Sequence, residues 1–285
     1  MSTLLPWQIS QWQHVLNLFQ QKRLPHALLL AGASGVGKKQ FAENISAILC
    51  CEAPTDQPCG QCHGCRLFQT NNHPDVLCVD VEEKSRAIKI DQVRELGEFI
   101  QKTPHTAQYK IVMLFQAEKM NIAAANALLK SLEEPAPNTL IILVSSQVGR
   151  LLPTLLSRCQ RINFSAPEKT LALEWLDAQN AQGDLVLALQ YAFGAPLLAK
   201  QYLEDDFVTF VQSLSDDIAQ VKNQKQSAVA VAEAWAKHDV EQVLEGLFSL
   251  VDGDVDFYDK LLEAKRSYVS GVNLNAQMMF EALLI

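Results

Sequence analysis

The sequence predicts an α/β domain with a parallel sheet, followed by an all-helical portion. The first part carries short apolar runs that are typical of buried strands, "HALLLAG", "DVLCVDV", "KIVMLFQ" and "TLIILVSS". They are separated by helical patterns, among them "IDQVRELGEFIQ" and "NIAAANALLKSLEE", and such alternation indicates a parallel sheet covered by helices. After "RINFSAPEKT" the amphipathic stretches "TLALEWLDAQ", "DLVLALQYAF" and "AVAVAEAWAKH" follow one another without a convincing strand.

Length and composition favour more than one core. The chain has 285 residues, of which 48% are hydrophobic and 20% charged, and this is enough to bury two or three hydrophobic cores. We expect one boundary near Ala166–Pro167 and a second in the acidic stretch around Glu204–Asp206. The predicted domains are therefore 1–166, 167–206 and 207–285.

Charge and hydropathy exclude two classes of protein. The formal net charge of −8 argues against a chain whose main task is to grip nucleic-acid phosphates, because such binding needs clustered Lys and Arg. No uninterrupted apolar run reaches the roughly 18 residues of a membrane-spanning helix, and "MSTLLPWQISQWQHV" lacks the order of a secretory signal. We therefore expect a cytoplasmic protein without a membrane partner.

The first predicted strand leads into a glycine-rich loop and a helix. "GASGVGKK" has the spacing of a phosphate-binding loop through Lys38, and strand, loop, helix is the context that such a loop requires. Gly32, Gly35, Gly37 and Lys38 are the candidate nucleotide-binding residues. Lys39, however, stands where the motif needs a hydroxyl to hold Mg²⁺.

The third predicted strand also departs from an active ATPase. "KIVMLFQAEKM" should end in an acidic pair, but Phe115 and Gln116 stand there. Because the hydroxyl and both acids are missing together, stabilisation of the transferred phosphoryl group is lost. We expect no ATP hydrolysis by this chain. Nucleotide binding without turnover stays open, as does a loop whose glycines only shape a turn.

A cysteine cluster follows the loop helix. "CCEAPTDQPCGQCHGC" contains two successive C-x-x-C spacings, with Cys50 or Cys51 upstream as a fourth thiolate. Four sulfurs suit tetrahedral Zn²⁺ in a closed, structural site, whereas a redox pair or an iron–sulfur cluster is a weaker interpretation. We expect one zinc ion per chain in a module at 50–65, held by Cys50, Cys59, Cys62 and Cys65, with Cys51 as the alternative to Cys50.

The cysteine module is a poor candidate for a DNA-binding site. Between Cys51 and Cys65 lie Glu52 and Asp56 but no Lys or Arg. A device that binds the nucleic-acid backbone needs positive charge. We therefore expect at most a minor DNA contact in this module.

Three passages carry a resemblance to a known family. They are the cysteine cluster, "NALLKSLEEP" (Asn126 to Pro135) and "LLPTLLSRC" (Leu151 to Cys159). With them the chain resembles the bacterial clamp-loader branch of the AAA+ family, and the helical part matches in character and order. The resemblance implies an AAA+ type sheet with a zinc insertion, a helical lid domain and a C-terminal helical collar domain.

The resemblance also implies a function. It is that of a non-hydrolysing subunit of the replicative DNA-directed DNA polymerase, in a five-subunit ring that places a sliding clamp on primed DNA. The implied partners are motor ATPase subunits of the gamma/tau type and a delta-type subunit. In that family the Arg of "SRC" reaches into a neighbour's ATP site, and here this is Arg158. Arg158 could instead be an ordinary helix-end Arg that pairs with a carboxylate. For the whole chain, the alternative function is that of an active ATPase that uses Lys38 in its own site.

Two further positions bear on the chain's own site. The family's motors carry a nucleotide-sensing Arg shortly after a Gly in the lid domain, and "FGAPLLAK" has Leu197 at that position. Ser145 and Ser146 follow "TLIILV" at the usual polar sensor position of the fold. The first departure favours an inactive local site.

Overall fold

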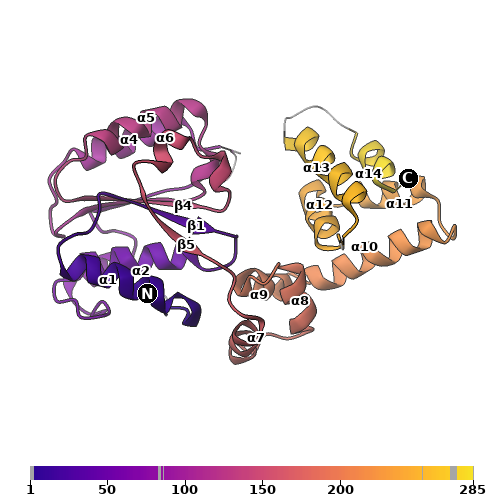
Figure 1. Cartoon of the computed structure of the whole chain (residues 1–285), viewed down its shortest axis with the longest axis horizontal. Helices are drawn as coiled ribbons and strands as arrows, with labels where there is room; N and C mark the ends of the chain where they lie inside the picture. Colours follow the sequence, from indigo (N-terminus) through magenta and orange to yellow (C-terminus); the bar gives the residue numbers. More distant parts are fainter. Residues whose placement is uncertain (1–2, 83–84, 86, 252, 270–274, 285) are drawn as a thin grey trace. The chain divides into compact units, whose positions relative to one another are not determined.

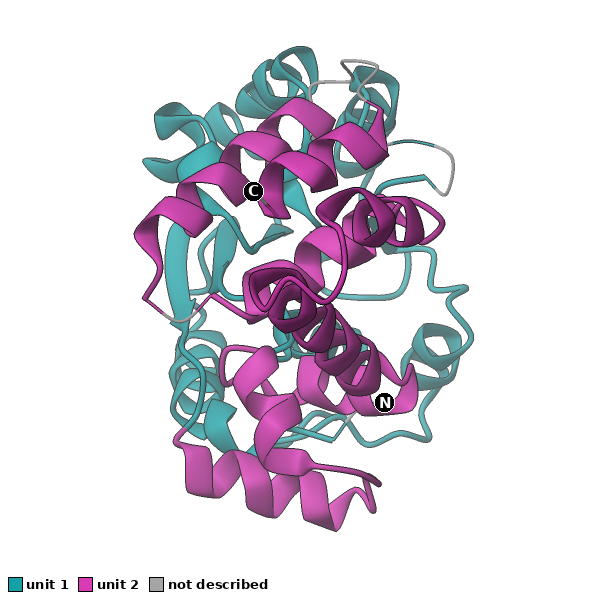
Figure 2. Cartoon of the chain, turned by 90° about the vertical axis from the view of Figure 1, so that its right-hand side faces the viewer, with its two compact units in different colours: residues 1–167 teal, residues 168–285 magenta. Residues whose placement is uncertain are grey.

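The computed structural model describes residues 3–82, 85, 87–251, 253–269 and 275–284. The chain divides into two compact units, Met1–Pro167 and Glu168–Ile285, which Figure 2 shows in different colours. The division lies one residue beyond the expected boundary at Ala166–Pro167. The fold class, α/β followed by all-α, is confirmed (Figure 1).

The first unit is built on a five-stranded parallel sheet in the order β2-β3-β4-β1-β5. The strands are β1 (Ala27–Gly32), β2 (Val76–Val79), β3 (Lys110–Leu114), β4 (Thr139–Ser145) and β5 (Gln160–Phe164). Every residue of β3 and β4 is buried, which explains their near-continuous apolar sequences. The sequence did not assign β5, because only Ile162 and Phe164 of its five residues are apolar and buried.

Helices cover both faces of this sheet. Figure 1 shows α1 (Ile9–Gln20) and α2 (Lys38–Cys50) on one face, and α4 (Ile90–Ile100), α5 (Ile122–Glu133) and α6 (Pro153–Leu156) on the other. One core joins α4, α5 and α6 to alternate residues of β1, β3 and β4. On the opposite face Phe41 of α2 meets Trp12 and Phe164 edge-on, with ring centroids 5.8 and 4.9 Å apart.

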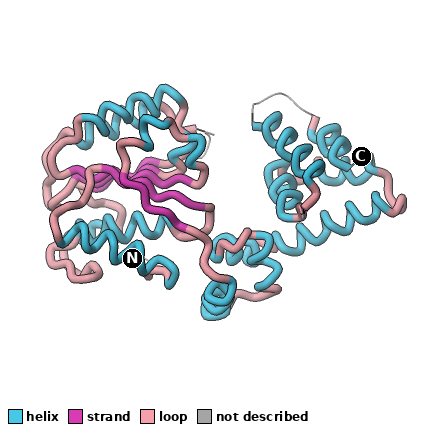
Figure 3. The backbone as a smooth tube through the Cα atoms, viewed as in Figure 1, coloured by secondary structure: helices cyan, strands magenta, loops and turns pink. Residues whose placement is uncertain are grey.

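The second unit contains helices and no strand among its described residues (Figure 3). The helices are α7 (Lys169–Ala178), α8 (Leu185–Tyr191), α9 (Pro196–Glu204), α10 (Phe207–Lys222), α11 (Ala228–Trp235), α12 (Val240–Ser249), α13 (Val255–Val269) and α14 (Ala276–Leu284). Their apolar residues form two clusters, and Phe210 and Leu250 pack against both. A division of this unit at 206/207 stays a prediction. Within the part of the chain that is described, no helix has the length and apolar character to cross a bilayer.

A buried ion pair fixes the amino ends of β2 and β3. Lys110 Nζ lies 2.8 Å from Asp75 Oδ1, and the two side chains are 2% and 0% exposed. The carboxylate also accepts the backbone N–H groups of His105, Thr106 and Ala107. Burial alone would raise the pKa of Asp75, but the hydrogen bonds from Lys110 and these amides outweigh it and lower the pKa. The pair therefore ties the loop between α4 and β3 to the start of β2.

Removing the ammonium group from this pair should destabilise the sheet unit. Lys110→Met leaves the Asp75 carboxylate buried without its counter-charge, and we expect a loss of about 3–5 kcal/mol in the free energy of unfolding. Urea denaturation measures this loss, and hydrogen exchange at Thr106 and Ala107 localises it. Lys102→Met, at an exposed position in the same loop, should change stability by less than about 0.5 kcal/mol. Equal losses of stability from the two substitutions would show that the ion pair does not hold the loop to the start of β2.

Candidate functional site

The glycine-rich loop lies at the carboxyl edge of the sheet. It leaves β1, which pairs with β4 on one side and β5 on the other, and enters α2 at Lys38. Gly32 packs so closely on β5 that a Cβ would lie 2.1 Å from the carbonyl oxygen of Phe164. Gly37, with φ of 88°, has the left-handed backbone that glycine adopts without strain. Both glycines are therefore required by the geometry of the turn.

Lys38 ties this loop to the end of β4. Its ammonium donates to the carbonyl oxygen of Gly32 at 2.7 Å, to that of Ala33, and to Ser146 Oγ at 3.4 Å. Burial lowers the pKa of Lys38 to about 8, and the charge of Glu118 partly opposes this shift. The Glu118 carboxylate in turn accepts the N–H of Ser146. Glu118 was not among the predicted site residues, because it lies two residues beyond the expected acidic pair at Phe115 and Gln116.

The N-terminal segment holds the other side of the loop. Gln8, at the end of a short 3-10 helix η1 (Pro6–Gln8), donates its Nε2 to the carbonyl oxygens of Val36 and Gly37 at 3.0 Å. Trp7 Nε1 donates to Val36 as well. The Gln8 side chain is fully buried. The loop is thus supported by its own chain from both sides, and no sequence motif pointed to these partners.

The three positions that would hold Mg²⁺ and activate water carry other chemistry. Lys39 places its ammonium 4.8 Å from the centroid of the Phe115 ring, in the range of a cation–π contact. Gln116 donates its side-chain amide to Asp80 Oδ1 at 2.8 Å. A cation, an aromatic ring and an amide therefore stand where a hydroxyl and a carboxylate would hold the metal and a second carboxylate would activate water.

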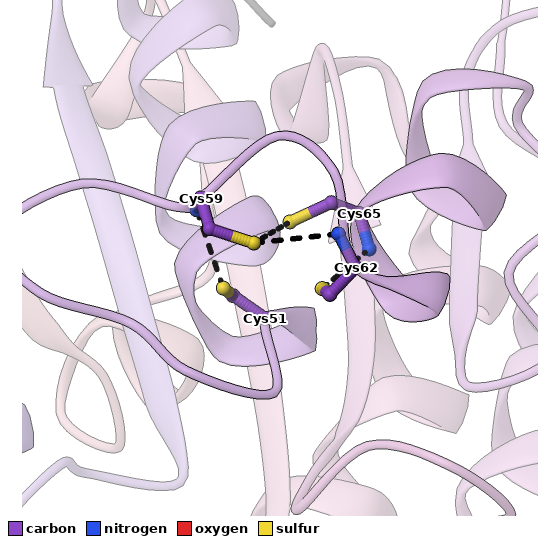
Figure 4. A group of neighbouring side chains, drawn as sticks. All are labelled: Cys51, Cys59, Cys62 and Cys65. Atoms are coloured by element: carbon purple, nitrogen blue, oxygen red, sulfur yellow. Dashed lines mark hydrogen bonds between the residues drawn. The ribbon is translucent and has the colours of Figure 1, made fainter.

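Four cysteine sulfurs gather between α2 and α3 (His63–Gln69). The Sγ atoms of Cys51, Cys59, Cys62 and Cys65 all lie within 4.8 Å of one another (Figure 4). Backbone N–H groups point at three of the sulfurs, those of Cys51, Cys59 and Cys62. Such donors stabilise thiolates, and four thiolates are the donor set of a structural zinc site.

The structure brings Cys51, rather than Cys50, into this group. Cys50 is the last residue of α2, and its sulfur is not one of the four that lie within 4.8 Å of one another. Cys51 has left the helix, with extended backbone angles of −75° and 132°. The expected assignment of Cys50 as the fourth ligand is therefore replaced by the alternative, Cys51. His63, the first residue of α3, lies outside the group.

The two neighbouring cysteines provide a matched test of the metal site. The purified chain should contain about one zinc per chain, because four thiolates form one tetrahedral site. Cys50→Ala should keep this zinc, whereas Cys51→Ala should lose most of it after a challenge with a chelator. Elemental analysis after gel filtration measures both. Loss of zinc from Cys50→Ala with retention in Cys51→Ala would contradict the ligand set.

Arg158 lies between α6 and β5, and its guanidinium contacts its own chain. Nη2 is 2.7 Å from Oε1 of Glu133, the last residue of α5. Nη1 donates to the carbonyl oxygen of Thr154 at 2.9 Å and to Ser157 Oγ at 3.3 Å. The Arg158 side chain remains 34% exposed. The carboxylate partner considered for a helix-end Arg is therefore present, and it comes from "NALLKSLEEP".

Arg158 and the glycine-rich loop lie at opposite edges of the same sheet. β5 runs parallel to β1, with Gln160 beside Leu28 and Phe164 beside Gly32. Arg158 precedes the amino end of β5, whereas the loop follows the carboxyl end of β1. A strand of five residues is about 16 Å long, so the guanidinium does not reach its own chain's loop.

Comparisons with known proteins identify the family. The family model described as "DNA polymerase III, delta subunit" matches residues 7–168. The DNA polymerase III subunit delta′ of Pseudomonas aeruginosa is 32% identical over 100% of this chain and 97% of its own length. The subunits delta′ of Haemophilus influenzae and Escherichia coli are 36% and 33% identical, over 73% and 70% of this chain and 64% and 61% of their own lengths. The chain therefore belongs to the family of DNA polymerase III delta′ subunits.

Proposed function

We propose that this chain is a non-hydrolysing clamp-loader subunit that completes the ATP site of a neighbouring subunit with Arg158. The observation that carries the proposal is the position of Arg158, which is partly exposed and lies at the sheet edge opposite its own loop. A guanidinium is always charged, planar and weakly hydrated, so it suits transfer to a phosphate across an interface. An Arg placed in this way serves another chain's nucleotide.

The chain's own loop supports a structural role. Lys38 is held by the carbonyl oxygens of the loop, and Gln8 and Trp7 hold Val36. The loop is thus hydrogen-bonded to its own chain on both sides. Lys39 and Phe115 offer no oxygen ligand, and the Gln116 amide donates to Asp80. These three positions therefore lack the hydroxyl and the carboxylates that hold Mg²⁺ and support phosphoryl transfer.

The proposed partners follow from the family. We propose a ring of five subunits in which motor ATPases of the gamma/tau type hydrolyse ATP, together with a delta-type subunit. The ring would place the sliding clamp on primed DNA in the cytoplasm. The chain contributes no polymerase or ATPase chemistry of its own, and its role within the DNA-directed DNA polymerase is that of a subunit. Zinc, held by Cys51, Cys59, Cys62 and Cys65, would pin the loop between α2 and α3.

The alternative function is an ATPase that works in its own site. The feature that favours it is the intact arrangement of Lys38, Ser146 and the loop glycines. The missing metal ligands oppose it. The purified chain should therefore show no ATP hydrolysis above a buffer control in the presence of Mg²⁺, and Lys38→Ala should behave in the same way. Robust hydrolysis that Lys38→Ala abolishes would establish the alternative.

Removal of Arg158 should impair the assembled complex. Because a trans-acting finger contributes on the order of 10³- to 10⁵-fold in rate, we expect Arg158→Ala to lower DNA-stimulated ATP hydrolysis of the reconstituted complex at least tenfold. Gel filtration must show equal assembly of both complexes. Arg150→Ala is the matched control, since Arg150 is also exposed but contacts Gln147 near the opposite edge of the sheet. An unchanged rate with Arg158→Ala would leave the chain only a scaffolding role.

A further inference from the structure

The guanidinium of Arg158 is turned back on its own chain by three acceptors. Two lie close by in sequence, the carbonyl oxygen of Thr154 and the hydroxyl of Ser157. The third, Glu133 Oε1, comes from the end of α5, and it is the only charged one of the three. Nη1 and Nη2 are thus both engaged within the chain.

This arrangement opposes contact with a phosphate. A guanidinium binds a phosphate best with two parallel N–H groups, and both edges that offer such a pair, Nε with Nη2 and Nη1 with Nη2, include the Nη2 that contacts Glu133. Nη1 in addition donates to the carbonyl oxygen of Thr154 and to the hydroxyl of Ser157. The Glu133 carboxylate also neutralises part of the charge that a phosphate would attract. A phosphate that approaches Arg158 must therefore compete with Glu133.

The ion pair between Arg158 and Glu133 is weak enough for a phosphate to displace the carboxylate. Both partners reach solvent, with Arg158 34% and Glu133 51% exposed. Ion pairs at such exposed positions are weak and are screened by salt. A phosphate carries more negative charge than one carboxylate, and the bond to Glu133 is a single one, so exchange from the carboxylate to the phosphate is feasible.

We propose that Glu133 is a positioning residue that holds Arg158 in a retracted orientation until the phosphate of a neighbouring subunit's nucleotide displaces it. This inference rests on the proposed function of Arg158 and adds a restraint to it. Glu133 does not touch the nucleotide; it acts through Arg158 alone. The contact is autoinhibitory, so its removal should increase the rate of the reaction that Arg158 assists.

The test compares four forms of the chain in the reconstituted clamp-loader complex. They are the unmodified chain, Glu133→Gln, Arg158→Ala and the double variant. Glutamine keeps an oxygen that accepts a hydrogen bond but removes the charge that strengthens it. We expect Glu133→Gln to raise the single-turnover rate constant of ATP hydrolysis about two- to fivefold at low salt. A gain of rate is a result that loss of structure does not produce.

Two controls connect the gain to the ion pair. The gain should shrink as salt is raised, because screening already weakens the pair in the unmodified chain. Glu134→Gln removes the same charge from the next exposed residue and should leave the rate unchanged. The double variant should be as slow as Arg158→Ala, since Glu133 acts only through the guanidinium.

The outcomes separate this inference from the proposed function. If Arg158→Ala lowers the rate but Glu133→Gln leaves it unchanged or lowers it, the restraint is wrong and the function of Arg158 stands. A gain that persists in the double variant would also overturn the restraint, because Glu133 would then act elsewhere. If Arg158→Ala has no effect, both proposals fail.

Discussion

The parallel pairing of β1 between β4 and β5 is the constraint on which the rest of the first unit depends. It brings the glycine-rich loop beside the end of β4, where Ser146 accepts a hydrogen bond from Lys38. The same pairing places the carbonyl oxygen of Phe164 against Gly32, so that a side chain at this position would clash. It also sends the amino end of β5, and Arg158 before it, to the opposite edge of the sheet. This pairing thus places the glycine-rich loop and Arg158 at opposite edges of the sheet.

Strands with continuous apolar runs and helices with clear periodicity could be predicted from the sequence. β3 and β4 are buried at every residue, so their apolar runs stand out, and α4 and α5 have clear helical periodicity. β5 was missed because only two of its five residues, Ile162 and Phe164, are apolar and buried. The ion pair between Asp75 and Lys110 was missed for a different reason. A buried ion pair has no local pattern, since Asp75 in the turn before β2 and Lys110 in β3 meet only in the folded chain.

The sequence identified some residues of each candidate site and missed others. The C-x-x-C spacings identified three of the four sulfurs, but only the end of α2 decides between Cys50 and Cys51. The loop motif identified Lys38. The residues that hydrogen-bond to the loop and to the adjoining Ser146, Gln8 and Glu118, come from segments far from the motif in sequence. The family resemblance drew attention to Arg158 and to "NALLKSLEEP" separately. Their contact through Glu133 needed the structure.

The central claim is that Arg158 works on a nucleotide outside its own chain. The most direct measurement is a structure of the reconstituted complex with ADP and a fluoride mimic of the γ-phosphate in the motor subunits. The account predicts the Arg158 guanidinium within hydrogen-bonding distance of that mimic in the adjacent subunit, with its contact to Glu133 broken and no metal ion at its own loop. Arg158 still paired with Glu133 beside a fully formed neighbouring site would contradict the account.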